Sequence, residues 1–347
     1  MQNYAANAIL TKSRAKYGKR LTVQNYKDMI LLDSVADVAS YLKTRTHYAD
    51  ALKNMNESLV HRGNLEFMLK AKLYEDFVHL CRFERAVGEH INEYVLLRGD
   101  ISQTLAFFRL YLAGRPQDLI LSLPEYFKHR RGIDFVALSR CRDYGEILKI
   151  FEKSPLYQVL SSFRPSGEKP IDYTMLEVML EKYIYDKMFE ITEKHSSGDS
   201  RRELNELFGL SAEIENIMRI YREKKYYNVS KAILRVQMIP HKRYLNTKQL
   251  NSLIEAEKAE DVISLLKETV YGRFFRDIKY TTMDDLMQGI RFKSIQRKMR
   301  VSSNPAVVMY CCIVLFDMEI EDITSIIEGV RYQLPSDDIK KLLVLEI

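Results

Sequence analysis

The same pattern of apolar residues occurs three times along the chain, in LTVQNYKDMILLDSVADVASYLKTRTHY (Leu21–Tyr48), GIDFVALSRCRDYGEILKIFEKSPLY (Gly132–Tyr157) and LNTKQLNSLIEAEKAEDVISLLKETVY (Leu245–Tyr271). We call these segments windows 1, 2 and 3. Counted from Val38, Ile147 and Val262, apolar residues stand at positions −12, −9, 0, +3 and +4: Tyr26, Met29, Val38, Tyr41 and Leu42; Phe135, Leu138, Ile147, Ile150 and Phe151; Leu250, Leu253, Val262, Leu265 and Leu266. Each window then ends on a tyrosine, Tyr48, Tyr157 or Tyr271. Because residues three and four apart share one helix face, each window predicts a short helix, a turn and a second amphipathic helix.

The spacing of the windows divides the chain into three similar units. Their origins are 109 and 115 residues apart, so a repeat of about 110 residues fills the 347-residue chain three times. Pro124 and Pro240 stand at similar distances before windows 2 and 3, and a proline favours the end of a helix. We therefore predict three homologous helical domains, over residues 1–126, 127–240 and 241–347.

A second pattern follows later in each unit. Three polar-apolar pairs stand nine positions before a basic residue: Asp100-Ile101 before Arg109, Asn216-Ile217 before Lys225, and Asp322-Ile323 before Arg331. Each pair is predicted to begin a helical stretch, and the Pro, Asp and Ser residues of the turn segment that follows each stretch are interpreted as helix start signals. The acidic run Glu319, Glu321 and Asp322 is interpreted in the same way, as stabilising a helix N-terminus.

The composition favours long helices. Glycine and proline number 13 and 8 in 347 residues, well below average usage of about 7% and 5%. The sequence has no Asn-Gly or Asp-Gly turn and no long alternating Val/Ile/Thr segment, which are the features that predict strands. We therefore predict an all-α fold. The closest glycines are 11 positions apart, which excludes phosphate loops, because their glycines lie within about six residues of one another.

Cysteine usage is typical of a protein from a reducing compartment, and the charge pattern is typical of solvated helices. Lys and Arg number 53 against 47 Asp and Glu, a net charge of +6, and both signs are interleaved as on solvated helix faces. The four cysteines form no CxxC motif. The N-terminus lacks the apolar stretch of a secretory signal. The longest apolar run, Ala306–Phe316, has 11 residues against the roughly 20 needed to span a bilayer. We expect a buried helix there and a soluble or peripherally attached protein.

No motif predicts catalysis, a metal site or a bound cofactor. HExxH, GxSxG and the Glu-x-x-His pairing of di-iron bundles are absent. One segment, RFKSIQRKMR (Arg291–Arg300), is unusual because it holds five basic residues and no acid, and helical spacing places basic and apolar residues on opposite faces. The basic face holds Lys293, Arg297 and Arg300, and the apolar face holds Phe292, Ile295 and Met299. The basic face is either solvated or meets an acidic protein or an anionic membrane surface. Nucleic acid is disfavoured as a partner, since no recognition motif is present.

Several short strings follow one another in a recognisable order. They are YAANA (Tyr4–Ala8), LTVQNY (Leu21–Tyr26), THY (Thr46–Tyr48), ENI (Glu215–Ile217) and EIEDITSIIEGVR (Glu319–Arg331), the last followed by Leu334-Pro335. In this order, and with the length and the threefold repeat, they resemble the C subunit (called d in eukaryotes) of V-type and archaeal-type rotary ATPases. The resemblance covers essentially the whole chain.

That resemblance implies a non-catalytic rotor subunit without a cofactor. Members of the family have three similar helical domains arranged around a pseudo-threefold axis as a funnel. They lie peripherally on the cytoplasmic side of the membrane, between the proteolipid ring (c-ring) and the central shaft of subunits D and F. Torque from ATP hydrolysis elsewhere passes through them to the ring, which moves H⁺ or Na⁺.

Two sets of cations become candidates for partner contacts under this resemblance. The set expected to line an axial surface and pair with acidic groups of the shaft is Arg109, Lys225 and Arg331. The set expected to face the ring or the membrane is Lys293, Arg297 and Arg300. The alternative is a stand-alone helical-repeat scaffold that binds protein partners, although a period of about 110 residues far exceeds the 20 to 47 of common solenoids. An enzyme with an unrecognised site has only scattered Asp and His residues to support it.

Overall fold

The computed structural model describes residues 2–55, 62–88, 90–128, 132–165, 171–227 and 229–344. In these ranges the only regular secondary structure is helical, so the all-α prediction is confirmed. The α-helices are α1 (Gln2–Tyr17), α2 (Val23–Ile30), α3 (Val35–Arg45), α4 (Ala49–Leu52), α5 (Arg62–Val87), α6 (Ile91–Leu112), α7 (Leu119–Ser122), α8 (Glu125–Lys128), α9 (Phe135–Leu138), α10 (Tyr144–Phe151), α11 (Tyr157–Ser161), α12 (Tyr173–His195), α13 (Gly198–Arg222), α14 (Lys231–Gln237), α15 (Thr247–Glu255), α16 (Ala259–Lys267), α17 (Phe274–Asp277), α18 (Met283–Val301), α19 (Pro305–Arg331) and α20 (Ser336–Lys341). Tighter or wider turns are η2 (Pro116–Asp118) and η4 (Val270–Arg273), both 3₁₀, and η3 (Glu223–Tyr227), a π-helix.

Each window folds as the sequence predicts, into two short helices joined by a turn. Window 1 forms α2 and α3, window 2 forms α9 and α10, and window 3 forms α15 and α16. The residues at positions 0 and +4 are fully buried in every window. Thr22, Asp134 and Asn246 cap the first helices, because each side chain accepts a hydrogen bond from the backbone N–H three residues later.

The tyrosine predicted to end window 2 requires a correction. Tyr157 is 37% exposed, and the buried residue beside it is Leu156. The turns show the true register, because in every window a hydroxyl oxygen accepts the N–H two residues later: Thr46 from Tyr48, Ser154 from Leu156, and Thr269 from Tyr271. Window 2 therefore has a leucine where windows 1 and 3 have a tyrosine.

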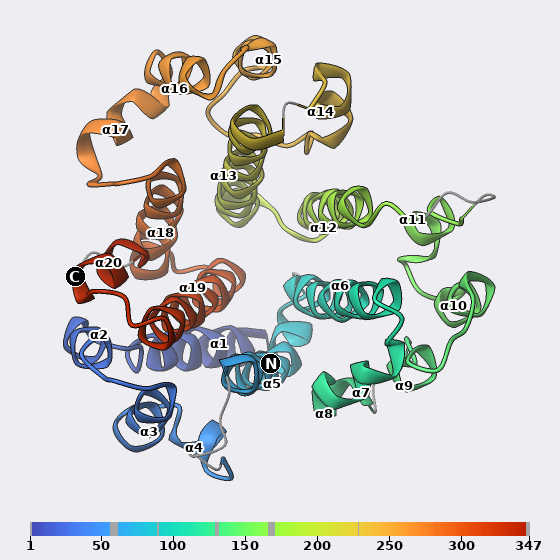
Figure 1. Ribbon diagram of the computed structural model, residues 1–347, viewed down its shortest axis with the longest axis vertical. Coiled ribbons are helices and arrows are strands. Elements are labelled where there is room, and N and C mark those ends of the chain that lie inside the picture. The colour runs from blue at the N-terminus through green and yellow to red at the C-terminus, as the bar shows by residue number, and fades with distance from the viewer. Residues whose placement is uncertain are drawn as a thin grey trace.

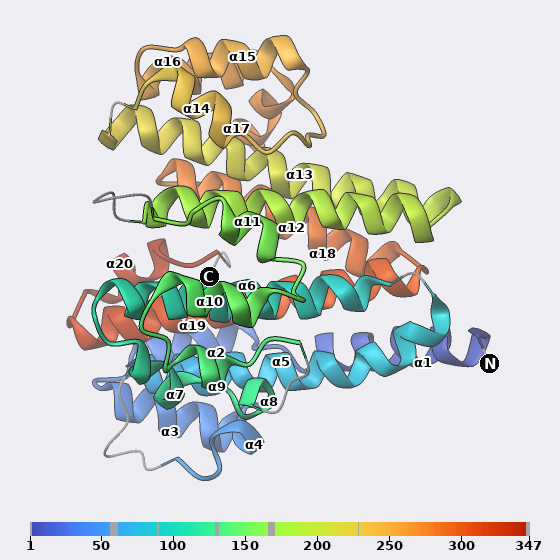
Figure 2. The same cartoon turned by 90° about the vertical axis from the view of Figure 1, so that its right-hand side faces the viewer.

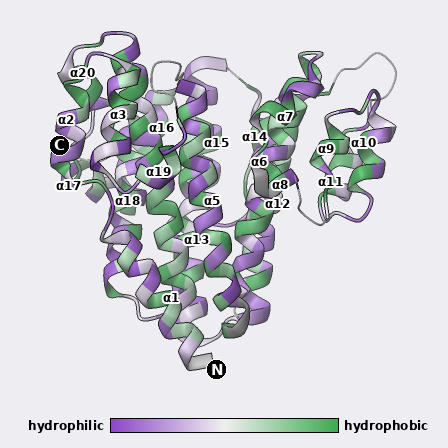
Figure 3. Cartoon of the chain, turned by 90° about the horizontal axis from the view of Figure 1, so that it is seen from below, coloured by the Kyte–Doolittle hydropathy of each residue, from purple (hydrophilic) through white to green (hydrophobic). Residues whose placement is uncertain are grey.

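The long helices lie side by side with the short helices around the outside (Figure 1), and most of the short helices lie toward one end of them (Figure 2). Helices α6, α13 and α19 run in the same direction, so their C-terminal ends lie at the same end of the molecule (Figure 2). The N-terminus of α1 lies at the opposite end (Figure 3). The first and last long helices, α1 and α19, contact each other and α5, which joins the beginning of the chain to its end.

Helix α19 is the central element of the largest apolar core. Every residue of the apolar run Ala306–Phe316 is buried there, as the sequence predicts. Helices α1, α5, α6, α12, α13 and α18 contribute to the same cluster of side chains. Among the described residues, no helix combines the length and the apolar character that crossing a bilayer requires.

Each window forms a smaller core with a long helix of the preceding unit, and for window 1 that unit is the last one of the chain. Window 1 contacts α19 and α5, window 2 contacts α6 and α12, and window 3 contacts α13 and α18. These clusters cross the sequence positions 126 and 240 and connect the first unit to the last. The division into 1–126, 127–240 and 241–347 stays a prediction drawn from sequence repetition.

The predicted helix starts at Asp100, Asn216 and Asp322 were wrong, because these residues lie inside α6, α13 and α19. The interpretation of the acidic run was wrong for the same reason, since Glu319 lies within α19 and is fully buried. Tertiary contacts use these polar groups instead. Asn216 Nδ2 donates to the Ile239 carbonyl at 2.8 Å, and Asn216 Oδ1 accepts from the Ile239 N–H at 2.9 Å.

Candidate functional site

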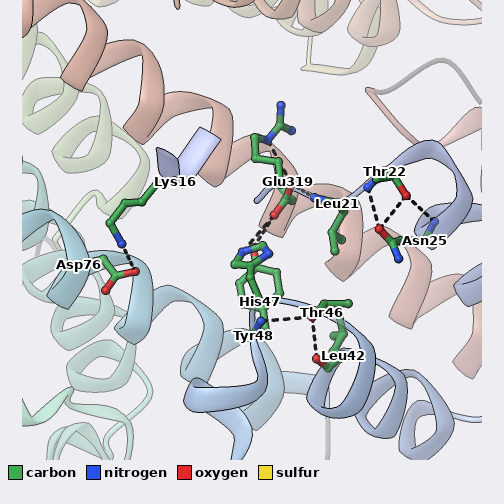
Figure 4. A network of polar contacts seen from close by, with 11 residues as sticks. Lys16, Leu21, Thr22, Asn25, Leu42, Thr46, His47, Tyr48, Asp76 and Glu319 are labelled. Carbon is green, nitrogen blue, oxygen red and sulfur yellow. Dashed lines mark hydrogen bonds and ion pairs between the residues drawn. The ribbon is translucent and has the colours of Figure 1, made fainter. Parts of the chain in front are cut away.

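A buried carboxylate joins window 1 to the last long helix. Glu319 on α19 accepts hydrogen bonds from Arg20 Nε at 3.1 Å, the Leu21 N–H at 2.9 Å and Tyr48 Oη at 2.9 Å. His47 Nε2 lies 3.5 Å from Glu319 Oε1, and Figure 4 shows the side chains of His47 and Tyr48 pointing toward the glutamate. Burial raises the pKa of the Glu319 carboxyl, while Arg20 beside it acts in the opposite direction. We call this cluster carboxylate site 1.

A second buried carboxylate, at the corresponding position of α13, joins that helix to window 3. Glu213 accepts hydrogen bonds from the backbone N–H groups of Arg243 (3.0 Å), Tyr244 (3.0 Å) and Leu245 (2.8 Å). Its other oxygen accepts from Tyr271 Oη at 2.7 Å. This cluster, carboxylate site 2, repeats the geometry of site 1, because each glutamate accepts from the first N–H of a window and from the tyrosine that ends it. Both glutamates also stand three residues before a polar residue, Asn216 or Asp322.

The third equivalent position is apolar. Leu97 of α6 stands three residues before Asp100, and Leu156 replaces the tyrosine of the other windows. Leu97 contacts the apolar cluster that contains Leu156. A leucine in each partner therefore stands where the other two junctions have a carboxylate and a hydroxyl, so neither side chain brings a buried polar group that needs a partner.

These junctions fix how α6, α13 and α19 stand relative to the short helices at one end. The first set of sequence-predicted cations lies in the final turns at that end: Arg109 in α6, Arg331 in α19, and Lys225 in the π-helical η3 that continues α13. All three side chains are exposed. The structure thus brings together at one end of the molecule three cations that lie more than 100 positions apart in sequence.

Each of these cations is next to a tyrosine ring. Arg109 Nη2 donates to Tyr173 Oη at 3.4 Å, a contact that raises the pKa of Arg109. Lys225 Nζ lies 5.4 Å from the ring centroid of Tyr221. The guanidinium of Arg331 lies 5.3 Å from the ring centroid of Tyr332. The contacts of Lys225 and Arg331 are cation–π contacts, and all three contacts restrain a long side chain without neutralising its charge.

Most other cations near this end have carboxylate partners. The pairs are Arg115–Asp118, Arg222–Asp284, Lys231–Glu257, Arg235–Glu255, Lys340–Asp337 and Lys341–Asp338. Within the described ranges, no carboxylate lies at ion-pair distance from Arg109, Lys225 or Arg331. We call these three residues the helix-end cations. They leave positive charge available to an acidic partner.

The second predicted set lies on α18, with the two faces that the sequence predicts. Lys293, Arg297 and Arg300 are exposed, whereas Phe292, Ile295 and Met299 are buried. The remaining two cations of the segment face other helices: Arg291 lies 3.8 Å from Glu215, and Lys298 lies 3.0 Å from Glu203 and 3.1 Å from Glu206.

The two sets of cations lie toward opposite ends of the long helices. Helix α18 ends at Val301, next to the N-terminal end of α19, whereas Arg331 lies at the other end of that helix. Since α19 has 27 residues, a rise of 1.5 Å per residue separates its two ends by about 40 Å. The molecule therefore presents two separate basic surfaces.

Residues 9–342 match the family model described as ATP synthase (C/AC39) subunit. The chain belongs to this family. The resemblance found in the sequence is confirmed, and this C/AC39 subunit is a component of a V/A-type ATPase. No curated protein matches the chain.

The described part of the C/AC39 subunit contains no group of three His, Cys, Asp or Glu side chains placed to hold a metal ion. Its four cysteines are buried and form no disulfide. Burial raises the pKa of the Cys141 thiol to about 11 and that of Cys312 to about 12, so both stay protonated and unreactive near neutral pH.

Sequence reasoning did not find the carboxylate sites of this C/AC39 subunit. The signal was present, because Glu213 and Glu319 occupy the same position relative to Asn216 and Asp322. The tyrosines that end windows 1 and 3 are their partners. A search for charged residues repeated at one offset, with aromatic partners repeated at another, would have paired them.

Proposed function

We propose that this C/AC39 subunit is a non-catalytic central-stalk (rotor) subunit that couples the shaft, made of subunits D and F, to the proteolipid c-ring. It lies peripherally at the cytoplasmic face of the membrane and transmits torque, while H⁺ or Na⁺ moves through the ring. Membership of the family supports this role. The low glycine content also supports it, since a coupling element has to resist bending.

The observation that carries the proposal is the set of helix-end cations. Three parallel helices end at the same side of the molecule, and each presents one exposed cation without a carboxylate partner in the described ranges. Three similar contacts around one end suit a partner that enters along the helix direction. We propose that Arg109, Lys225 and Arg331 pair with acidic groups of the shaft.

The proposal includes the arrangement of the units. Three helical domains, residues 1–126, 127–240 and 241–347, surround a pseudo-threefold axis as a funnel. Support comes from the three windows, each of which contacts a long helix of the preceding unit, window 1 doing so with the last helix of the chain. Such a closed series of contacts lets force applied to one unit reach the others.

The basic face of α18 is the proposed contact with the ring or the membrane surface. Lys293, Arg297 and Arg300 are exposed and lie toward the end opposite to Arg331. A subunit between two partners needs separate surfaces for them, and about 40 Å of α19 separates these two. Alanine substitutions at all three positions should weaken assembly with the ring, and intact assembly would contradict this assignment.

The two basic surfaces provide controls for each other. The first variant carries Arg109→Glu, Lys225→Glu and Arg331→Glu, and the second carries Lys293→Glu, Arg297→Glu and Arg300→Glu. Both change the net charge equally, so any general effect of charge is shared. Binding to a purified D–F shaft is measured at low salt, where exposed charges are screened least.

The first variant should bind the shaft about ten- to hundredfold more weakly, since each exposed contact contributes up to about 1 kcal/mol. The second variant should bind the shaft like the unsubstituted chain. Equal affinities of the first variant and the unsubstituted chain at low salt would refute the proposed shaft contact.

A further inference from the structure

The three equivalent helix ends differ in how the helix stops. Helix α6 ends in a Schellman motif, in which the Arg115 N–H donates to the Leu110 carbonyl at 2.9 Å and the N–H of Gly114 (φ +73°) donates to the Tyr111 carbonyl at 3.0 Å. Helix α19 ends in the same motif: Leu334 N–H to the Gly329 carbonyl at 2.9 Å, and Gln333 N–H to the Val330 carbonyl at 3.1 Å, with Gln333 at φ +53°. Both helices therefore stop abruptly after the basic residue.

Helix α13 does not stop in this way. It continues into η3, a π-helical turn over Glu223–Tyr227. A π-turn holds one more residue per hydrogen-bonded ring than an α-helix, is rarely stable alone and occurs frequently at functional sites. The repeat thus contains one helix end whose geometry departs from the other two.

The π-turn displays two neighbouring tyrosines to solvent. Tyr226 is 64% exposed and Tyr227 is 71% exposed, and their ring centroids are 6.3 Å apart. Lys225 Nζ lies 5.1 Å from the Tyr226 ring centroid and donates a hydrogen bond to Tyr221 Oη at 3.3 Å. This contact restrains the Tyr226 ring relative to Lys225, and a restrained side chain loses less entropy on binding.

We propose that the π-turn η3 is the principal anchoring site for the shaft, and that it binds an acidic polypeptide segment carrying apolar side chains. This inference rests on the proposed function, because the partner is the same shaft. It adds that binding is asymmetric: Tyr226 and Tyr227 at the end of α13 contribute more than the residues at the ends of α6 and α19.

Charge and residue type define the occupant. Lys224 and Lys225 have no carboxylate at ion-pair distance within the described ranges, so an acidic segment supplies the missing partners. Tyrosine is enriched among the residues that dominate protein interfaces, because it buries a large rigid surface and keeps a hydroxyl for hydrogen bonding. Apolar side chains on the segment are needed to cover the two rings.

A polypeptide fits this surface better than a flat anionic membrane. The carboxylates Glu257 and Asp284 lie beside the turn, paired with Lys231 and Arg222. A bilayer surface would cover these carboxylates together with the lysines and would be repelled by them. A narrow segment can contact the lysines and tyrosines alone.

The test is the variant Tyr226→Ala/Tyr227→Ala in the full chain, with binding to the purified D–F shaft measured at low and high salt. The affinity should fall about tenfold to hundredfold at both salt concentrations, because apolar contacts are not screened. Tyr332→Ala tests the asymmetry, because this tyrosine is 65% exposed at the end of α19 and contacts Arg331; it should weaken binding less than the double variant does. Tyr4→Ala is the control, since this tyrosine is 76% exposed in α1, whose N-terminus lies at the opposite end of the molecule, and it should leave the affinity unchanged.

The outcomes separate this inference from the proposed function. Unchanged shaft binding of Tyr226→Ala/Tyr227→Ala, together with weaker binding after charge reversal at Arg109, Lys225 and Arg331, would overturn the anchor and leave the proposed function standing. Weaker binding to vesicles of phosphatidylcholine and phosphatidylserine, with shaft binding intact, would instead assign the turn to the membrane and also overturn it. Unchanged shaft binding of every variant would refute both proposals.

Discussion

Replacing Glu213 by leucine tests whether the carboxylate holds window 3 on α13. The substitution copies Leu97, the natural residue at the equivalent position of α6. It removes the acceptor of four donors, of which the Leu245 N–H and Tyr271 Oη are buried. Each buried donor left without an acceptor costs about 1–3 kcal/mol, so the variant should lose about 2–6 kcal/mol of unfolding free energy.

Urea denaturation followed by circular dichroism measures the loss, and hydrogen exchange locates it. The amides of Arg243, Tyr244 and Leu245 should exchange faster, because their acceptor is gone. Glu206→Leu is the matched control, since Glu206 lies two turns earlier on α13 and forms only partly exposed ion pairs with Arg243 and Lys298. It should cost less than about 1 kcal/mol.

A double variant tests the reason for the loss. In Glu213→Leu/Tyr271→Phe the unmatched hydroxyl is also removed, so this protein should be more stable than Glu213→Leu alone by about 1–3 kcal/mol. The reasoning would be refuted if Glu213→Leu were no more harmful than Glu206→Leu, or if removing the hydroxyl lowered the stability further. Apolar contacts alone would then hold window 3.

Three further changes have defined expected outcomes. Glu319→Gln should lower the unfolding free energy by about 3 kcal/mol, because Arg20, whose side chain is 10% exposed, loses its counter-ion. The same change should speed amide exchange in α2 and α3. Unchanged exchange in these helices would contradict the role of site 1. Burial, opposed by the charge of Asp76 and assisted by that of Lys16, lowers the pKa of His47 to about 4, so the fold favours the neutral ring. The stability that His47 contributes should be complete above pH 6.5 and decline as the pH falls toward 4, and His47→Gln should remove this component from urea midpoints measured across that range. Gly209→Ala should cost about 1–3 kcal/mol, because its Cβ would lie 2.8 Å from the Lys242 carbonyl oxygen. Gly63→Ala, which meets nothing within 4 Å, should not destabilise the protein, and equal urea midpoints for the two alanine variants would contradict the steric argument.

Local patterns were sufficient to predict the helices of the windows. Val38 and Leu42 recur at the same spacing in windows 2 and 3, and capping residues such as Thr22 stand directly before the helices. These signals act over one or two turns, where backbone hydrogen bonding alone fixes which residues share a face. The buried course of Ala306–Phe316 was predictable for a similar reason, since eleven apolar residues have no polar face to expose.

The same local signals failed where a polar residue serves a distant contact. Asn216 has the chemistry of a helix cap, yet it lies inside α13 and binds Ile239, which is 23 positions away. Nothing within a helical turn of Asn216 distinguishes a cap from a tertiary hydrogen bond. The register at Leu156 failed similarly, because a one-residue shift between Leu156 and Tyr157 is resolved only by the side chain that enters the core.

The sequence by itself determined the all-α class, the three windows and the identity of the six candidate cations. Only the tertiary structure decided that Leu21 meets Glu319 across 298 positions, that α6, α13 and α19 end on one side, and that η3 departs from the other two helix ends. The physical reason is a difference in range. Helical periodicity is set by hydrogen bonds between residues four apart, whereas contacts between distant residues depend on how all the helices fill one core.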